Sequence, residues 1–69
     1  MKCILYDSEG HDRCSGIGTW VNNNVIIDID IFNSPEGLNT ITNIKIDDVD
    51  WDVIGYLGEF GGKFRFKVQ

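Results

Sequence analysis

The stretch that decides the fold is Val25-Ile26-Ile27-Asp28-Ile29-Asp30-Ile31-Phe32, in which apolar residues recur at every second position. Successive side chains of an extended strand point to opposite faces. The aliphatic residues at odd positions therefore share one face, while Asp28 and Asp30 share the other. A helix would scatter the same residues around its circumference. The segment predicts a strand with an apolar inner face and an outer face that carries carboxylates.

The rest of the chain contains further short segments of the same kind. We expect strands at residues 2–7, about 13–21, 40–46, 51–57 and 63–68, with turns rich in Gly, Asn and Ser between them. Gly16 and Gly18 interrupt the second strand and indicate a bulge or a sharp bend. The sequence predicts an all-β fold, a single small antiparallel barrel or strongly curled sheet of five to six strands, SH3-like or OB-like, with little or no helix. Residues 1–69 are expected to form one domain.

Matching of apolar faces predicts how the central strands pair. If Asn22-Asn23-Asn24 forms a turn, Ile17 faces Ile29 and Trp20 lies on the outer face. The strand at residues 25–32 is also expected beside the strand at 40–46, with Asp28 opposite Lys45.

The last hairpin has its own predicted register. A four-residue loop after residue 57 places Val53 opposite Phe66, so both face the core. The same register places Tyr56 on the outer face opposite Lys63. The connection at residues 33–39 is expected to be a loop that contains at most one helical turn.

The charge balance bears on the class of partner. Six basic and eleven acidic residues give a net charge of −5, which disfavours direct binding of nucleic acid and favours a partner with a basic surface. Lys63, Arg65 and Lys67 alternate with Phe64 and Phe66, a pattern that also occurs in RNA-binding strands. Because the phenylalanines should point inward, we expect these cations to pair with acidic neighbours instead.

The N-terminal segment and the two cysteines predict a compartment. No stretch is long enough to cross a membrane, and the apolar part of residues 1–7 is too short for a signal peptide. We therefore expect a cytoplasmic protein without membrane contact, in which Cys3 and Cys14 stay reduced.

Residues suited to metal binding or catalysis are few. Cys3, His11 and Cys14 offer three zinc ligands, with Asp7 or Asp12 as a fourth, but they lack the paired short spacings of structural zinc sites. His11 has no recognisable nucleophile or orienting group. We predict no metal, no cofactor, no catalytic residue and no enzymatic activity.

Surface aromatic residues and carboxylates suggest binding of another protein. The predicted partner-binding residues are Trp20, Asp28, Asp30, Asp52 and Tyr56, because aromatic anchors within a charged rim are typical of protein–protein hot spots. The apolar members could equally pack into a second small core under the 33–39 loop.

The sequence thus predicts a small acidic, non-enzymatic protein that occludes a basic surface of another macromolecule. Carboxylates on strands can stand in for phosphates, so the class includes phage-type inhibitors of nucleic-acid-handling host defence enzymes. Two alternatives stay open. One is an assembly module that joins a homodimer or a larger complex through strand edges. The other is a protein that sequesters a small ligand between Trp20, Trp51 and Tyr56.

Overall fold

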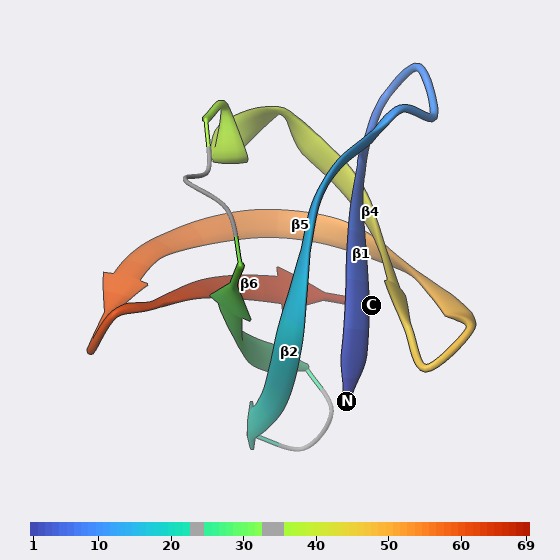
Figure 1. Ribbon diagram of the computed structural model, residues 1–69. Helices are drawn as coiled ribbons and strands as arrows, with labels where there is room; N and C mark the ends of the chain where they lie inside the picture. Colours follow the sequence, from blue (N-terminus) through green and yellow to red (C-terminus); the bar gives the residue numbers. More distant parts are fainter. Residues whose placement is uncertain (23–24, 33–35) are drawn as a thin grey trace.

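Six antiparallel strands close into a small barrel (Figure 1). The computed structural model describes residues 1–22, 25–32 and 36–69. The elements are β1 (Lys2–Asp7), β2 (Asp12–Asn22), β3 (Ile26–Ile31), the single 3₁₀ turn η1 (Leu38–Thr40), β4 (Ile41–Ile46), β5 (Val49–Phe60) and β6 (Lys63–Val68). The prediction of a small all-β antiparallel barrel is confirmed.

The strands follow the spatial order β1-β2-β3-β6-β5-β4. β4 returns beside β1, and β6 lies beside β3, so two Greek-key arrangements share the ring. The predicted pairing of β3 with β4 is therefore wrong. Leu5 of β1 is opposite Ile44 of β4, and Asp28 is opposite Arg65 rather than Lys45. Alternation along one strand indicates its inner face, but it does not indicate which other strand lies beside it.

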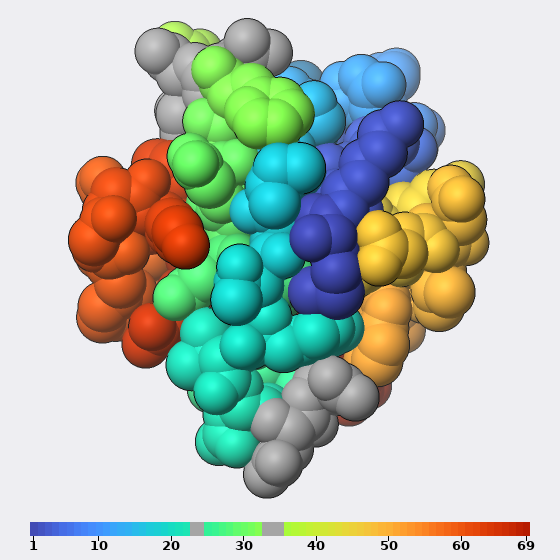
Figure 2. Space-filling view, turned by 60° about the horizontal axis from the view of Figure 1, so that its bottom comes forward, coloured from blue at the N-terminus to red at the C-terminus, as the bar shows by residue number. Residues whose placement is uncertain are grey.

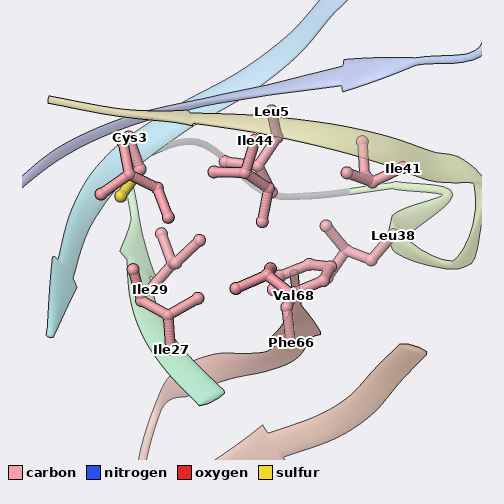
Figure 3. Packing of buried hydrophobic residues seen from close by; sticks show 10 residues of the cluster. Cys3, Leu5, Ile27, Ile29, Leu38, Ile41, Ile44, Phe66 and Val68 are labelled. Carbon is pink, nitrogen blue, oxygen red and sulfur yellow. The ribbon is translucent and has the colours of Figure 1, made fainter. Parts of the chain in front are cut away.

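The core contains mainly aliphatic side chains from β1, β3, β4 and β6, which meet inside the ring (Figure 3). Ile27 and Ile29 are fully buried, as the alternation predicts. Ile31 is half-buried against this core, and Val25, just before β3, is exposed. The buried set is Cys3, Leu5, Ile27, Ile29, Leu38, Ile41, Ile44, Ile46, Phe66 and Val68.

The register between β2 and β3 differs from the prediction by one residue. Gly18 is opposite Ile29, and Trp20 is opposite Ile27. A one-residue slip turns every side chain of a strand to the other face, so Ile17 points outward and is 46% exposed. The glycine is needed inside, because a Cβ on Gly18 would lie 2.6 Å from the sulfur of Cys3.

The register between β5 and β6 also differs. Val53 is opposite Val68, and Tyr56 is opposite Phe66. The connection is the two-residue turn Gly61-Gly62, with φ angles of 60° and 79°, rather than a four-residue loop. Two irregularities in the ladder shift the pairing further. The prediction that Tyr56 lies on the outer face is therefore wrong.

Two predicted turns fall partly outside the described residues. Residues 23–24 belong to the expected Asn turn, and residues 33–35 belong to the expected 33–39 loop. Gly37 adopts a left-handed conformation, with φ 64°, directly before η1. In the described part of the chain, no helix has the length and apolar character needed to cross a bilayer.

Candidate functional site

Four aspartates gather on the hairpin that joins β4 to β5. They are Asp47, Asp48, Asp50 and Asp52, all exposed, and are called the acidic hairpin below. Figure 2 shows this segment in gold beside blue β1, across the molecule from the orange β5–β6 hairpin. The acidic hairpin thus lies at one side of the barrel with all four carboxylates exposed.

Backbone conformation and two hydrogen bonds hold the tip of the acidic hairpin. Asp47 and Asp48 have φ angles of 48° and 69°, as a two-residue hairpin turn of type I′ requires. The amide of Lys2 donates to Oδ1 of Asp47 at 3.0 Å. The amide of Asp47 donates to the carbonyl of Lys2 at 2.9 Å. The tip is therefore tied to β1 rather than free in solution.

The other two carboxylates follow the start of β5. Asp50 is opposite Lys45, and Asp52 is opposite Asn43, whose Nδ2 donates to Oδ1 of Asp52 at 3.1 Å. Within residues 1–22, 25–32 and 36–69, no ion pair within 4.0 Å includes a carboxylate of the acidic hairpin. Its four negative charges are not neutralised by a direct salt bridge there.

Asp28 differs from these residues because its carboxylate already forms an ion pair with Arg65. Nε and Nη2 of Arg65 donate to its two carboxylate oxygens at 2.7 and 3.0 Å. The hydrogen bonds from Arg65 hold the pKa of Asp28 below its ordinary value. The guanidinium also lies 4.2 Å from the ring centroid of Phe60. The prediction that the cations of β6 pair with acidic neighbours is confirmed for Arg65, whereas no ion pair within 4.0 Å among the described residues includes Lys63 or Lys67. Asp28 is bound mainly by the protein's own Arg65.

Apart from Asp28, the structure separates the predicted partner-binding residues into two pairs. Asp30 and Asp52 are exposed on the outer surface. Trp20 and Tyr56 are half-buried and pack against the core. Trp20 makes an edge contact with Trp51, with ring centroids 5.2 Å apart. The prediction that Trp20 lies on the outer face is wrong, because the one-residue shift in the β2–β3 register turns its side chain toward the core.

The predicted aromatic patch is therefore not assembled. Tyr56 packs against Phe66, with ring centroids 5.1 Å apart. Three further apolar residues are expected on the outer sides of their strands: Ile26, Phe32 and Ile54. Ile26 is half-buried, whereas Phe32, directly after β3, and Ile54 of β5 are exposed. The acidic hairpin could have been identified from the sequence more readily than the aromatic patch, because four of the six residues at 47–52 are aspartates.

A second group of charged residues occupies the β1–β2 loop. Oδ1 of Asp7 accepts hydrogen bonds from the amides of Glu9 and His11 at 2.9 and 3.0 Å. Nδ1 of His11 lies 3.4 Å from Oδ2 of Asp7 and 3.5 Å from Oε2 of Glu9. The hydrogen bond from the His11 amide is the main cause that lowers the pKa of Asp7.

The two cysteines do not join this group. Cys3 is buried in the core and Cys14 is half-buried against it, and both are free thiols. Burial raises the pKa of each thiol. His11 lies instead on the exposed loop, so Cys3, His11 and Cys14 do not form one ligand set.

A shallow hollow of about 360 Å³ lies between the β1–β2 loop and the acidic hairpin. Its lining residues are Tyr6, Asp7, Gly10, Asn43, Lys45 and Asp50. Two carboxylates and a tyrosine ring thus border a depression large enough for one side chain of a partner.

Comparison with models of known protein families, with curated proteins and with solved structures found no match to this chain.

Proposed function

We propose that this protein is a non-enzymatic binding protein whose acidic hairpin covers a basic surface of another macromolecule. The observation that carries the proposal is the exposure of four aspartates within six residues, none in a direct ion pair within the described residues. Other carboxylates, on Asp7 and Asp28, are already paired with cations of this chain. Other exposed carboxylates, such as Asp30 and Glu59, stand singly along the sequence, whereas the acidic hairpin concentrates four within six residues.

The arrangement suits a partner that normally holds a phosphate backbone. Side chains two residues apart on one face of a strand, as at Asp50 and Asp52, are separated by roughly 7 Å. Such a row of fixed negative charges can occupy a basic nucleic-acid groove without offering bases or sugars. A nucleic-acid-handling enzyme, such as a host defence nuclease, is the partner class proposed.

The hollow beside the acidic hairpin adds a place for an anchor. A guanidinium entering it would meet the carboxylate of Asp50 and the ring of Tyr6. Arginine pairs with carboxylates through a planar fork and stacks on aromatic rings. Lys45 also lines the hollow, so a bound guanidinium is expected to lie nearer Asp50 than the ammonium group of Lys45.

A pull-down at low and high salt tests this proposal. The immobilised protein is exposed to a cell lysate, beside Asp50→Lys/Asp52→Lys. The matched control is Glu36→Lys/Glu59→Lys, which changes the net charge by the same amount at exposed sites outside the acidic hairpin and the β1–β2 loop. The proposal expects a nucleic-acid-handling protein that is released by salt and lost only with the first variant. Equal capture by all three proteins contradicts it.

The assembly alternative has one observation in its favour. Among the described residues, β4 pairs with β5 over Val49–Asp52, whereas β6 pairs with it over Val53–Phe60. In that part of the chain, the second half of β5 is thus hydrogen-bonded to a strand on one side only, which leaves its other edge available to a second copy. Three apolar side chains are exposed in this half: Ile54, Leu57 and Phe60. Light scattering over a range of concentrations distinguishes this alternative, because it requires a dimer that Leu57→Lys dissociates.

The ligand-sequestering alternative finds less support. Trp20 and Trp51 contact each other, and Tyr56 contacts Phe66. All three candidate stacking surfaces are therefore engaged by the protein's own core.

A further inference from the structure

The β1–β2 loop, which extends from one end of the barrel (Figure 1), brings three potential metal ligands together. They are a carboxylate oxygen of Asp7, a carboxylate oxygen of Glu9 and a ring nitrogen of His11, all within 4.8 Å of one another. We propose that these three residues form a binding site for a first-row divalent cation such as Zn²⁺. The site is separate from the acidic hairpin, and its ligands differ from the cysteine-containing set considered in the sequence. The proposal replaces the sequence-based expectation that the protein binds no metal.

The distances within the group fit one ion. Zinc binds imidazole nitrogen and carboxylate oxygen at about 2.1 Å, so two ligands of a tetrahedral zinc stand about 3.4 Å apart. The corresponding separations from Nδ1 of His11 are 3.4 Å to Asp7 and 3.5 Å to Glu9. Small rotations of the exposed His11 and Glu9 side chains toward Oδ2 of Asp7 are therefore enough to place all three ligands around a common centre.

The loop orients the first ligand in advance. Oδ1 of Asp7 is occupied by the amides of Glu9 and His11, which leaves Oδ2 directed toward the imidazole. The amide of Gly10 donates to the carbonyl of Asp7 at 3.0 Å, and the amide of Asp7 donates to the carbonyl of His11 at 3.1 Å. Hydrogen-bonded carboxylates of this kind are typical of metal sites, because the second partner fixes the ligand's direction.

The donor set indicates the class of ion. One imidazole with two carboxylates suits zinc and its first-row neighbours better than calcium or magnesium, which prefer oxygen ligands alone. Three protein ligands leave at least one coordination position for water or for a ligand from a partner.

One cation of the protein competes for the same oxygen. Nη1 of Arg13 lies 3.7 Å from Oδ2 of Asp7, and the Arg13 side chain is 46% exposed. A bound metal ion must displace this guanidinium toward solvent. Removal of the arginine's charge is therefore expected to strengthen metal binding.

Calorimetric titration of the full chain with ZnCl₂ at neutral pH tests the site, and ¹⁵N–¹H spectra locate the ion. We expect one zinc per chain, with the largest shifts at the amides of Glu9, Gly10 and His11. His11→Ala and Glu9→Gln should each weaken binding by at least about tenfold. Arg13→Gln should strengthen it severalfold.

The control is Asp12→Asn, which removes a neighbouring exposed carboxylate outside the group. It should bind zinc nearly as the unmodified protein does. The proposal is overturned by no saturable binding at millimolar zinc, by binding that His11→Ala leaves intact, or by shifts confined to the acidic hairpin. All the substituted side chains are exposed, so loss of binding with unchanged spectra elsewhere reports on the site rather than on folding.

Discussion

Asp28 of β3 and Arg65 of β6 form a two-pronged ion pair across the outer face of the barrel, with contacts of 2.7 and 3.0 Å. The same guanidinium lies over the ring of Phe60 at the end of β5. One arginine thus links three neighbouring strands of the ring. This arrangement also explains why a carboxylate in the middle of an acidic protein is not available to a partner.

Loss of this ion pair should lower stability in a pH-dependent way. Asp28→Asn removes the charge that Arg65 binds, and we expect the melting temperature at pH 7 to fall by a few degrees. The folded state holds the pKa of Asp28 below the ordinary value of 3.8. Its stabilisation is therefore fully present above pH 3.8 and is lost as the pH falls through the folded pKa.

Thermal unfolding of both proteins from pH 7 down to pH 2 checks this prediction. The difference in melting temperature should shrink in the most acidic samples, where the carboxylate is protonated in both states. A constant difference across the whole range would show that the ion pair is not its cause. Asp30→Asn, at an exposed position on the same strand, is the control.

The close approach of β2 to β3 should make Gly16 irreplaceable. A Cβ at this position would lie 2.1 Å from the carbonyl oxygen of Asp30, a backbone atom that cannot move without shifting the strand. We expect Gly16→Ala to lower the free energy of unfolding by about 3 kcal/mol or to prevent folding. Gly55→Ala is the matched control, since its nearest neighbour would be 4.0 Å away. Urea denaturation of the two variants should give clearly separate midpoints, and coincident midpoints would contradict the strand contact.

A glycine in the turn of the acidic hairpin should stabilise the protein. Asp48 has a φ angle of 69°, which glycine adopts more readily than aspartate. We expect Asp48→Gly to raise the free energy of unfolding by about 0.5 kcal/mol. Asp48→Ala, which removes the same charge but disfavours this conformation, should lower it. If both variants shift stability in the same direction in urea, charge rather than backbone conformation governs the turn.

The sequence predicts strands well in this protein because alternation reports directly on burial. Ile27 and Ile29 are buried where the pattern places them, and six strands occur near the expected positions. Registers were less predictable, because matching of faces assumes regular ladders. The β2–β3 ladder shifts between Trp20 and Asn22, and the β5–β6 ladder shifts twice.

The candidate site was only partly predictable for the same reason. The predicted registers place Trp20 and Tyr56 on the surface, whereas both pack against the core. The sequence does not indicate that Arg65, 37 residues away, is the neighbour of Asp28. Asp52 is exposed in the acidic hairpin, whose composition was visible in the sequence. Pairing between β3 and β6 joins residues 37 positions apart, and local patterns contain little information about such contacts.

Competition with DNA is the most direct test of the proposed occlusion of a nucleic-acid surface. The captured partner is purified, bound to a fluorescent DNA duplex and titrated with this protein at constant salt. The account predicts that the protein releases the duplex and that Asp50→Lys/Asp52→Lys does not. A stable complex that contains the partner, the duplex and this protein together would contradict it.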